Sequence, residues 1–306
     1  MDSLLTELHT LRDWLRWGTS RFNEAQLCFG HGTENAYDEA AWLILHALHL
    51  PPDRLEPFMD TRLAHGERLA VLDLLQQRMT RRIPAAYLTK EAWLGDFRFY
   101  VDERVIVPRS YFAELLAEGF APWIEDPEAV EDVLDLCTGS GCLAILMAHA
   151  FPNAEVDAVD ISADALAVAR RNVDDYGLGE QVRLVASDVF DGLDDRRYDL
   201  IISNPPYVTT ASMAELPPEY RHEPALALGA GEDGLDVVRR ILANAGNHLK
   251  PGGLLAVEVG HNRDLVEAAF PDLPLMWIDT PSSENKLFLI HAEDLPPPPA
   301  RKRRKT

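Results

Sequence analysis

The chain has 306 residues, of which 47% are hydrophobic and 26% are charged, and this balance is typical of a globular protein rather than a disordered or fibrous one. No segment reaches the roughly 18 uninterrupted apolar residues of a membrane span. The acidic residues Asp2, Glu7 and Asp13 argue against a secretory signal at the N-terminus. The three cysteines form an odd set without zinc-site spacing, which fits a reducing cytoplasm.

The formal charge of −21 is unevenly distributed. Five of the 29 basic residues lie in the terminal run Arg301–Lys305, so the other 24 face 50 acidic residues and the rest of the chain carries −26. A body this acidic repels a phosphate backbone, which predicts no tight DNA binding and favours a basic protein as partner. Residues 295–306 are expected to form a disordered basic tail, either a solubilising end or a weak electrostatic tether to RNA.

The first 84 residues are expected to form a small helical domain. Apolar residues recur at helical spacing near the N-terminus: Leu4, Leu5, Leu8, Leu11, Trp14 and Leu15. Further helices are predicted over about 35–48 and about 63–79. His46 and His49 share one helix face, but they have no third ligand candidate nearby, so no metal site is expected. This part carries no catalytic motif, and its role is either substrate recognition or packing.

Two apolar runs flank Gly95-Asp96 and predict a tight hairpin. Residues 85–107 are therefore interpreted as a linker between two domains. The chain then reaches Pro108-Arg109, after which a helix over 110–120 is expected, with Ser110 as a candidate cap.

From Val130 onward, strand-like and helix-like segments alternate, which predicts an α/β domain with a doubly wound, mostly parallel sheet. The predicted strands cover 133–136, 154–160, 182–186, 200–202 and 254–259, with two further strands at 275–278 and 286–290. The predicted helices cover 142–150, 163–176 and 234–249, and Lys250–Gly253 is expected to end the last of them.

A glycine-rich turn, Cys137-Thr-Gly-Ser-Gly141, joins the first of these strands to its helix. Glycines let the backbone approach a ligand closely, and the helix N-terminus presents free N–H groups. The spacing Gly139-x-Gly141-x-x-Ala144 also matches the dinucleotide fingerprint, and Asp160 ends the next strand 21 residues after Gly139. A carboxylate there can accept both hydroxyls of a ribose, so these residues alone fit NAD as well as another adenosine cofactor.

The third strand ends in Ser187-Asp188-Val189-Phe190. Asp188 offers a polar group, and the two apolar side chains after it offer a wall for a purine ring. The structural alternatives are that Asp188 only caps a turn and that Phe190 only belongs to the core.

The buried run Leu200–Ile202 ends in Asn204-Pro205-Pro206-Tyr207, at the edge of the sheet where open α/β proteins bind their ligands. Asn204 offers a side-chain carbonyl and Pro205 a backbone carbonyl, while neither proline has an N–H to donate. Such an acceptor-rich turn can hold both hydrogens of a flat –NH2 group, and Tyr207 adds an aromatic face. The alternatives are a turn without function and, for Tyr207, a hydrophobic lid.

This strand and its Asn-Pro-Pro-Tyr turn resemble the amino-methyltransferases that use S-adenosylmethionine and methylate amide or exocyclic nitrogens. The likeness in the order of the motifs covers about residues 35–292. The hairpin and Val107-Pro108-Arg109 are similar to the joint between the helical and catalytic domains in the glutamine-methyltransferase family. Residues Ile83–Thr89 and Val107–Ser110 look more like its ribosomal-protein branch, because release-factor enzymes continue with Pro-Glu-Thr where this chain has Ser110–Phe112.

The resemblance implies a seven-stranded Rossmann-like methyltransferase sheet over residues 108–294, closed by an antiparallel hairpin, and the cofactor S-adenosyl-L-methionine. The matched positions imply that the cofactor is bound by Thr138, Gly139, Ser140, Gly141, Asp160, Val189 and Asn204, to which the argument from the residues adds Asp188. Cys137 stands where many relatives have glycine and Val189 where some have tryptophan. Both departures are compatible with a site that uses only backbone or apolar contact there.

The implied reaction is methyl transfer to the side-chain amide nitrogen (N5) of a glutamine in the third protein of the large ribosomal subunit. Asn204, Pro205 and Tyr207 are the expected catalytic residues, and Pro206 is expected to join them in binding the substrate. The reaction requires neither a metal nor a covalent intermediate.

The alternatives are a glutamine methyltransferase of peptide-chain release factors, an adenine-N6 nucleic-acid methyltransferase and a non-catalytic ribosome-assembly factor. An NAD dehydrogenase would need a catalytic His or Tyr-Lys pair that does not stand out in the sequence. Residues 208–234 are expected to close over the substrate as a long loop, in which Glu223 and Asp233 either contact the cofactor or only shape turns.

Overall fold

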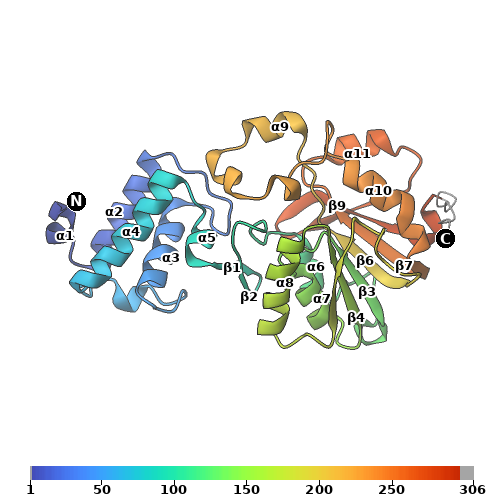
Figure 1. Ribbon diagram of the computed structural model, residues 1–306, viewed down its shortest axis with the longest axis horizontal. Coiled ribbons are helices and arrows are strands. Elements are labelled where there is room, and N and C mark those ends of the chain that lie inside the picture. Colours follow the sequence, from blue (N-terminus) through green and yellow to red (C-terminus); the bar gives the residue numbers. More distant parts are fainter. Residues whose placement is uncertain (1, 297–306) are drawn as a thin grey trace.

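The computed structural model describes residues 2–296 and divides into a helical N-terminal part and a larger α/β part (Figure 1). The N-terminal part contains, in chain order, α1 (Asp2–Glu7), α2 (Leu11–Glu24), α3 (Ala36–Ala47), the 3-10 turn η1 (Glu56–Phe58), α4 (His65–Arg81) and α5 (Ala85–Thr89). The basic run of the predicted tail, 301–305, lies outside the described residues.

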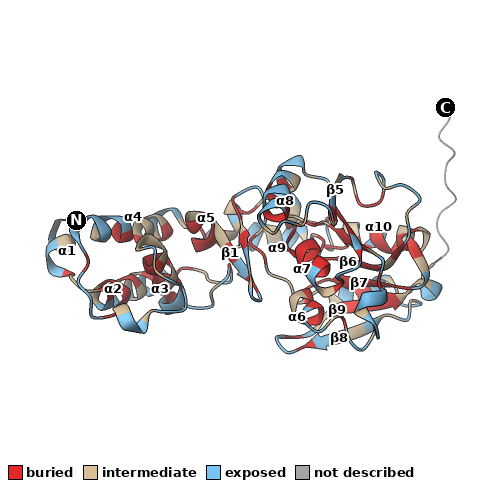
Figure 2. Ribbon diagram, turned by 90° about the horizontal axis from the view of Figure 1, so that it is seen from below, coloured by how far each residue is buried: buried red, intermediate tan, exposed pale blue. Residues whose placement is uncertain are grey.

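The apolar stripe near the N-terminus spans two helices. The N–H of Thr10 binds the carboxylate of Asp13 (2.9 Å) and the hydroxyl of Thr10 accepts the N–H of Asp13 (3.2 Å), a reciprocal capping box that starts α2. The predicted second and third helices correspond to α3 and α4 within two residues at each end. Buried side chains of α2, including Trp14, pack with those of α3 and α4 in one core, which Figure 2 shows on the inward faces of these helices.

The predicted hairpin is present as β1 (Glu91–Leu94) and β2 (Phe97–Tyr100), which pair antiparallel. Gly95 in its turn has a φ of +57°, a conformation that favours glycine. The side chain of Asn172, from α8 (Ala163–Asp175), binds both the N–H and the carbonyl of Tyr100, at 2.8 Å and 3.0 Å. These bonds fix the hairpin to the α/β part.

The helix expected over 110–120 is shorter and is observed as α6 (Phe112–Ala117). The hydroxyl of Ser110 accepts the N–H of Phe112 at 3.2 Å. The helix ends early because Gly119 and Phe120 adopt φ values of +62° and +64°, which a right-handed helix does not contain.

Seven strands form one sheet in the order β5-β4-β3-β6-β7-β9-β8, which confirms the predicted α/β class. The parallel strands are β3 (Asp132–Leu136), β4 (Glu155–Asp160), β5 (Val182–Ala186), β6 (Tyr198–Ser203) and β7 (Leu249–Glu258). β9 (Ser283–His291) runs antiparallel to both β7 and β8 (Met276–Thr280), so the closing hairpin implied by the resemblance is present.

Helices cover both faces of this sheet (Figures 1 and 2). α6, α7 (Cys142–Ala150) and α8 lie on the face that receives Leu200 and Ile202 of β6, and α10 (Asp236–Asn244) and α11 (Arg263–Ala269) lie on the face that receives Ile201. Successive residues of a strand point to opposite faces, so a strand covered on both sides needs a continuous apolar run. The α/β part also contains the short 3-10 turns η2 (Pro127–Ala129), η5 (Ala245–Asn247) and η6 (Ala292–Asp294).

The predicted end of the last helix was placed too late. β7 begins at Leu249, so Lys250–Gly253 lies inside a strand rather than before it. The side chain of Lys250 forms ion pairs with Asp132 of β3 (2.8 Å) and Asp199 of β6 (2.9 Å), and these pairs hold the Pro-Gly-Gly segment against the sheet.

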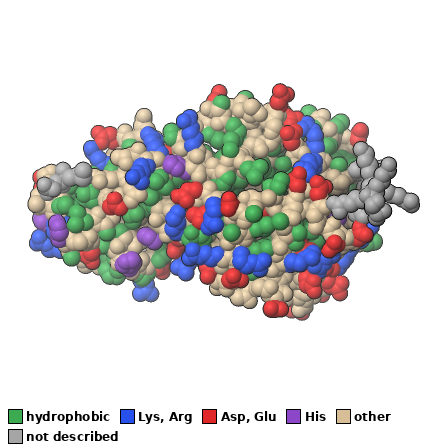
Figure 3. Space-filling view, viewed as in Figure 1, with side chains coloured by type: hydrophobic (Ala, Val, Ile, Leu, Met, Phe, Trp, Pro, Cys, Tyr) green, Lys and Arg blue, Asp and Glu red, His purple; other side chains and the backbone are tan. Residues whose placement is uncertain are grey.

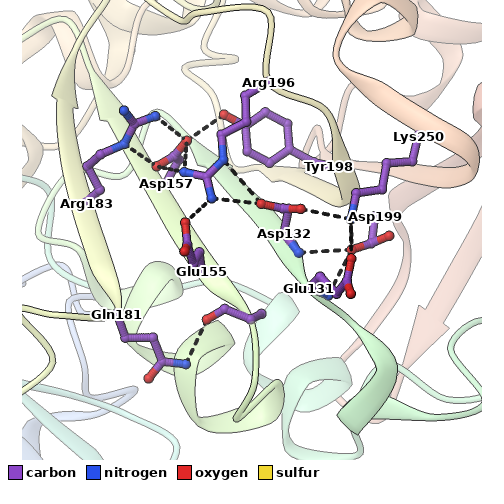
Figure 4. Close-up of polar contacts among 11 residues, drawn as sticks. Glu131, Asp132, Glu155, Asp157, Gln181, Arg183, Arg196, Tyr198, Asp199 and Lys250 are labelled. Carbon is purple, nitrogen blue, oxygen red and sulfur yellow. Dashed lines mark hydrogen bonds and ion pairs between the residues drawn. The ribbon is translucent and has the colours of Figure 1, made fainter.

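A charged cluster ties the amino-terminal ends of the parallel strands together (Figure 4). The buried carboxylate of Asp157 accepts two bonds from Arg183, both of 2.7 Å, and one of 2.6 Å from the hydroxyl of Tyr198. Arg196 binds Asp132 at 2.8 Å and also pairs with Asp157. Because a buried carboxylate needs such partners, the cluster links β3, β4, β5 and β6 at the edge opposite the expected ligand site.

Residues 208–235, which we call the bridging segment, are more ordered than a loop. They contain α9 (Thr210–Glu215) and the 3-10 turns η3 (Pro218–His222) and η4 (Ala225–Ala227). Figure 1 shows this segment reaching from the sheet towards the N-terminal helices. Glu219 is one of the connecting residues, because its carboxylate accepts the N–H of Cys28 (3.0 Å) and a bond from Arg82 (3.0 Å).

Candidate active site

A cavity of about 270 Å³ lies at the carboxyl ends of β3, β4, β5 and β6, beneath the bridging segment. Its lining residues are Arg104, Val105, Ile106, Cys137, Gly139, Val159, Asp160, Ile161, Ser162, Ala165, Ser187, Asp188, Val189, Asn204, Pro206, Pro224, Leu226, Ala227, Gly229, Val237 and Arg240. Six of the predicted site residues are therefore brought together around one space: Gly139, Asp160, Asp188, Val189, Asn204 and Pro206.

The turn after β3 presents its backbone to this cavity. Gly139 has a φ of +55°, and a Cβ built on it would meet no atom within 4 Å, so open space lies beside it. Cys137 and Val189 also adopt positive φ values, +62° and +53°. These two positions, which depart from the family pattern, thus keep a backbone conformation that favours glycine, and for the β-branched Val189 that conformation is unusual.

Three other predicted residues of this turn, Thr138, Ser140 and Gly141, do not line the cavity but contact the protein interior. The hydroxyl of Thr138 donates to the buried carboxylate of Asp135 (2.6 Å). Ser140 is buried, and Gly141 lies so close to α8 that a Cβ would come within 3.1 Å of the Ala169 Cβ. The side chains of Thr138 and Ser140 therefore shape the turn from within the protein, and the lack of a side chain at Gly141 lets the turn pack closely on α8.

Asp160 ends β4 as a fixed pair of acceptors. One carboxylate oxygen accepts the N–H of Gly139 (2.9 Å) and the other accepts the N–H of Ser162 (2.8 Å). Burial raises the pKa of Asp160, and these backbone bonds oppose the rise. Each oxygen keeps further acceptor capacity, so the carboxylate can receive two neighbouring hydroxyl groups.

Asp188 and Phe190 have different environments. The carboxylate of Asp188 binds Arg240 of α10 at 2.7 Å, and both residues line the cavity. Phe190 is buried and stacks on His248 with ring centroids 4.7 Å apart, away from the lining. The purine wall expected from Phe190 is therefore wrong, because this ring fills the core.

Two apolar side chains form walls that the sequence reasoning missed. Ile161 and Leu226 line the cavity and remain 55% and 59% exposed, more than any other large hydrophobic side chain among the described residues. Such exposure at a cavity leaves apolar surface for a ligand to cover. The position of Ile161 directly after Asp160 was a signal that could have identified it.

The carboxamide of Asn204 has a defined orientation. Its Nδ2 donates to the backbone carbonyl of Arg109 at 3.2 Å, which leaves Oδ1 as the atom free to accept hydrogen bonds at the cavity. Pro206 also lines the cavity, whereas Pro205 is buried and does not.

Tyr207 is held against two glycines just outside the lining. A Cβ on Gly260, whose φ is +55°, would lie 2.6 Å from Tyr207 Cε2, and one on Gly234 would lie 2.3 Å from the Tyr207 carbonyl oxygen. That carbonyl also accepts a bond of 2.6 Å from Asn262 Nδ2. Burial, with a contribution from the charge of Glu258, raises the pKa of Tyr207, so the phenol stays protonated.

Comparisons with known proteins identify the family of this fold and site. A family model described as "Methyltransferase small domain" matches residues 114–216, and one described as "PrmC N-terminal domain" matches residues 13–89. The chain is 58% identical over 289 residues to the "Ribosomal protein uL3 glutamine methyltransferase" of Neisseria meningitidis serogroup A, covering 94% of this chain and 95% of that one. It is 58% identical over 289 residues to the protein of the same name from Bordetella pertussis, covering 94% and 97%.

The chain belongs to the family of ribosomal protein uL3 glutamine methyltransferases. This result confirms the resemblance to the glutamine-methyltransferase family and its ribosomal-protein branch. It also removes the dehydrogenase interpretation of the glycine-rich turn, because the matching family model is that of a methyltransferase.

In this methyltransferase, Glu223 and Asp233, the two acids of the bridging segment considered for cofactor contact, do not line the cavity. Asp233 accepts the N–H of Leu235 (3.1 Å) and pairs with Arg239, so it shapes the start of α10. Glu223 binds Arg109, a residue that the sequence reasoning noticed only as part of a family motif. No signal along the chain pairs these two residues, since 114 positions separate them.

Within residues 2–296, no group of three or more His, Cys, Asp or Glu side chains is arranged to hold a metal ion. None of the helices in that described range is both long and apolar enough to cross a membrane.

Proposed function

We propose that this protein transfers a methyl group from S-adenosyl-L-methionine to the side-chain amide nitrogen of a glutamine in the ribosomal protein uL3. The observation that carries the proposal is the bond from Asn204 Nδ2 to the Arg109 carbonyl, which leaves Oδ1 of this cavity-lining residue available as an acceptor. A primary amide has two N–H donors on its nitrogen, which is the chemistry that such an acceptor selects. The names of the relatives support glutamine as the acceptor of the methyl group.

The cavity has the features that S-adenosylmethionine needs. Asp160 would receive the two ribose hydroxyls, since both of its oxygens are fixed and each can accept another bond. Gly139 offers open space beside the backbone for the amino acid part of the cofactor. Ile161 and Leu226 offer exposed apolar surface to the adenine ring, and Asp188 a polar group at its edge.

The proposed catalytic residues act by positioning and by electrostatics. When bound, S-adenosylmethionine supplies an electrophilic methyl group on a sulfonium. In this proposal Asn204 Oδ1 accepts one N–H group of the glutamine amide. The backbone carbonyl of Pro205, a residue that does not line the cavity itself, accepts the other from substrate bound beside the cavity. The two acceptors aim the amide nitrogen, and positioning of this kind can be worth ~7–11 kcal/mol. The same oxygens stabilise the positive charge that develops on the nitrogen. The ring of Tyr207 adds about 0.5–2 kcal/mol by facing that charge.

The charge of the protein supports a basic protein substrate. Lys and Arg side chains lie among Asp and Glu side chains on the face shown in Figure 3, and outside the terminal run the chain carries −26. Proteins that bind ribosomal RNA are rich in Lys and Arg, because their partner is a phosphate backbone. We assign recognition of such a substrate to the helical domain, residues 1–84, and transfer to residues 108–294, and we expect the reaction in the cytoplasm.

Ribosomes from cells that lack this protein test the proposal. Their uL3 should be lighter by one methylene unit than uL3 from the parent cells, with the difference mapped to one glutamine. Expression of the wild-type protein should restore the methyl group, and expression of the Asn204→Ala variant should not. A methyl group that persists in the deleted cells would contradict the proposed function.

A further inference from the structure

A chain of polar contacts connects the bridging segment to Asn204. The fully buried carboxylate of Glu223 holds the guanidinium of Arg109 through two bonds, of 2.6 Å and 2.7 Å. The same carboxylate accepts the N–H of Val107 at 3.0 Å. The carbonyl of Arg109 then accepts the Nδ2 of Asn204 at 3.2 Å. Glu223 thus binds both ends of the segment Val107–Arg109, which carries the Arg109 carbonyl.

The Glu223–Arg109 pair is ionised and has one favoured geometry. Burial opposes ionisation of Glu223, but the hydrogen bonds and charges of Arg109 and of His31, whose Nε2 lies 3.6 Å from the carboxylate, outweigh it and hold the pKa of Glu223 at about 2. The ring of Tyr220 lies under the guanidinium, with Arg109 Cζ 5.5 Å from its centroid. Two parallel bonds between planar groups fix orientation as well as distance.

The orientation of the Asn204 carboxamide decides whether the site can bind an amide. A carboxamide can rotate to present either its oxygen or its –NH2 group. The –NH2 group would oppose the donors of the glutamine amide, whereas the oxygen accepts them. Because the Arg109 carbonyl accepts from Nδ2, it favours the orientation that directs Oδ1 to the cavity.

We propose that Glu223 and Arg109 are positioning residues that hold the Asn204 carboxamide in its accepting orientation. The inference rests on the proposed function, since the orientation of Asn204 matters to turnover only if Asn204 binds the substrate amide. It gives a role to the Pro108-Arg109 segment and to Glu223, which do not line the cavity themselves. Their neighbours in the chain, residues 104–106 and Pro224, do line it.

Glu219 provides a matched control in the same segment. Its carboxylate is also fully buried and also has arginine partners, Arg78 at 3.4 Å and Arg82 at 3.0 Å. These arginines lie in the N-terminal part, and Glu219 makes no bond to Arg109 or Asn204 within the described residues. A Glu-to-Gln change there removes a buried charge without touching the contacts that orient the carboxamide.

The kinetic test compares the Glu223→Gln, Arg109→Lys and Glu219→Gln variants of the full chain on the protein that the wild type methylates. Glu223→Gln and Arg109→Lys should each lower kcat on the order of 10-fold to 100-fold, because misplacement of a reacting group has effects of that size. The KM for the protein substrate and the Kd for S-adenosylmethionine should stay within about threefold. Glu219→Gln should keep kcat within about twofold, even where its thermal midpoint falls as far as that of Glu223→Gln.

A double-mutant cycle separates positioning from general support. In the Asn204→Ala background, Glu223→Gln should lower kcat no further, because the group through which it acts is gone. Multiplicative losses, an unchanged kcat in Glu223→Gln, or a loss of cofactor affinity in parallel with kcat would each overturn the inference.

A measurement without substrate keeps the inference distinct from the proposed function. The side-chain amide signals of Asn204, assigned by their loss in Asn204→Ala, can be followed by nitrogen-15 NMR. Their hydrogens should exchange slowly in the wild type and in Glu219→Gln, and faster in Glu223→Gln, where the bond to the Arg109 carbonyl is loosened. A wild type that methylates no glutamine would refute the proposed function, whereas unchanged exchange in Glu223→Gln would refute the positioning role.

Discussion

Replacement of Asp160 by alanine should weaken S-adenosylmethionine binding by at least ~100-fold. Both oxygens of Asp160 are already oriented by the N–H groups of Gly139 and Ser162, so two charge-assisted bonds to the ribose hydroxyls would be lost. Each such bond contributes ~1.5–3 kcal/mol, which gives a lower value of about 3 kcal/mol for the pair. Since every 1.4 kcal/mol is tenfold in Kd, the affinity should fall by two orders of magnitude or more.

Isothermal titration calorimetry with S-adenosylmethionine measures this change directly. Asp164→Ala is a suitable control, because Asp164 lies two residues into α8 from its cap Ser162, is exposed and does not line the cavity. The control should bind the cofactor within about twofold of the wild type. A loss below tenfold in Asp160→Ala, or an equal loss in Asp164→Ala, would refute the assignment of the ribose to Asp160.

Three further predictions concern the acceptor side of the site and its surroundings. Asn204→Ala should lower kcat by ~10²–10³, the usual cost of removing one group that stabilises transition-state charge, while calorimetry shows an unchanged Kd for the cofactor; wild-type turnover would contradict the role of Asn204. Gly260→Ala should displace the Tyr207 ring, because the new Cβ would lie 2.6 Å from it, and should lower kcat about tenfold or more with little change in cofactor affinity; an unchanged kcat would show that the ring position is unimportant. Burial raises the pKa of Glu258 to about 7 from an ordinary value of 4.5, so the folded protein retains a proton that the unfolded chain releases, and stability from this group falls as pH rises between about 4.5 and about 7. Glu258→Gln, which keeps an acceptor for the Ser110 hydroxyl, should therefore reduce the fall of the thermal midpoint across that range, and an identical pH profile would contradict the raised pKa.

The sheet, and six of the residues that line the cavity, could be predicted from the sequence because both follow from local patterns. Strands buried on two faces need continuous apolar runs, so β6 was visible as Leu200–Ile202. Polar groups at the carboxyl ends of such strands come directly after the runs, which is why Asp160, Asp188 and Asn204 could be predicted to lie together, and all three line the cavity.

The missed features depend on contacts between distant parts of the chain. The Arg109–Glu223 pair joins residues 114 positions apart, and the arginine partners of Glu219 lie in α4 and directly after it, more than 130 positions away. The direction in which a side chain points could not be predicted either. Thr138 lies in the glycine-rich turn, but its hydroxyl donates to the buried Asp135 instead of facing the cavity. The break before α2, by contrast, had a readable local signal, because a threonine followed three residues later by an acid is a capping box.

Intact-mass spectrometry of two candidate substrates tests most directly whether this protein methylates a glutamine of uL3. The purified protein and S-adenosylmethionine are incubated separately with uL3 and with a peptide-chain release factor, and each product is digested to map the change. We expect a gain of one methyl group on a glutamine of uL3 and none on the release factor. A methyl group on the release factor alone, or on neither protein, would contradict it.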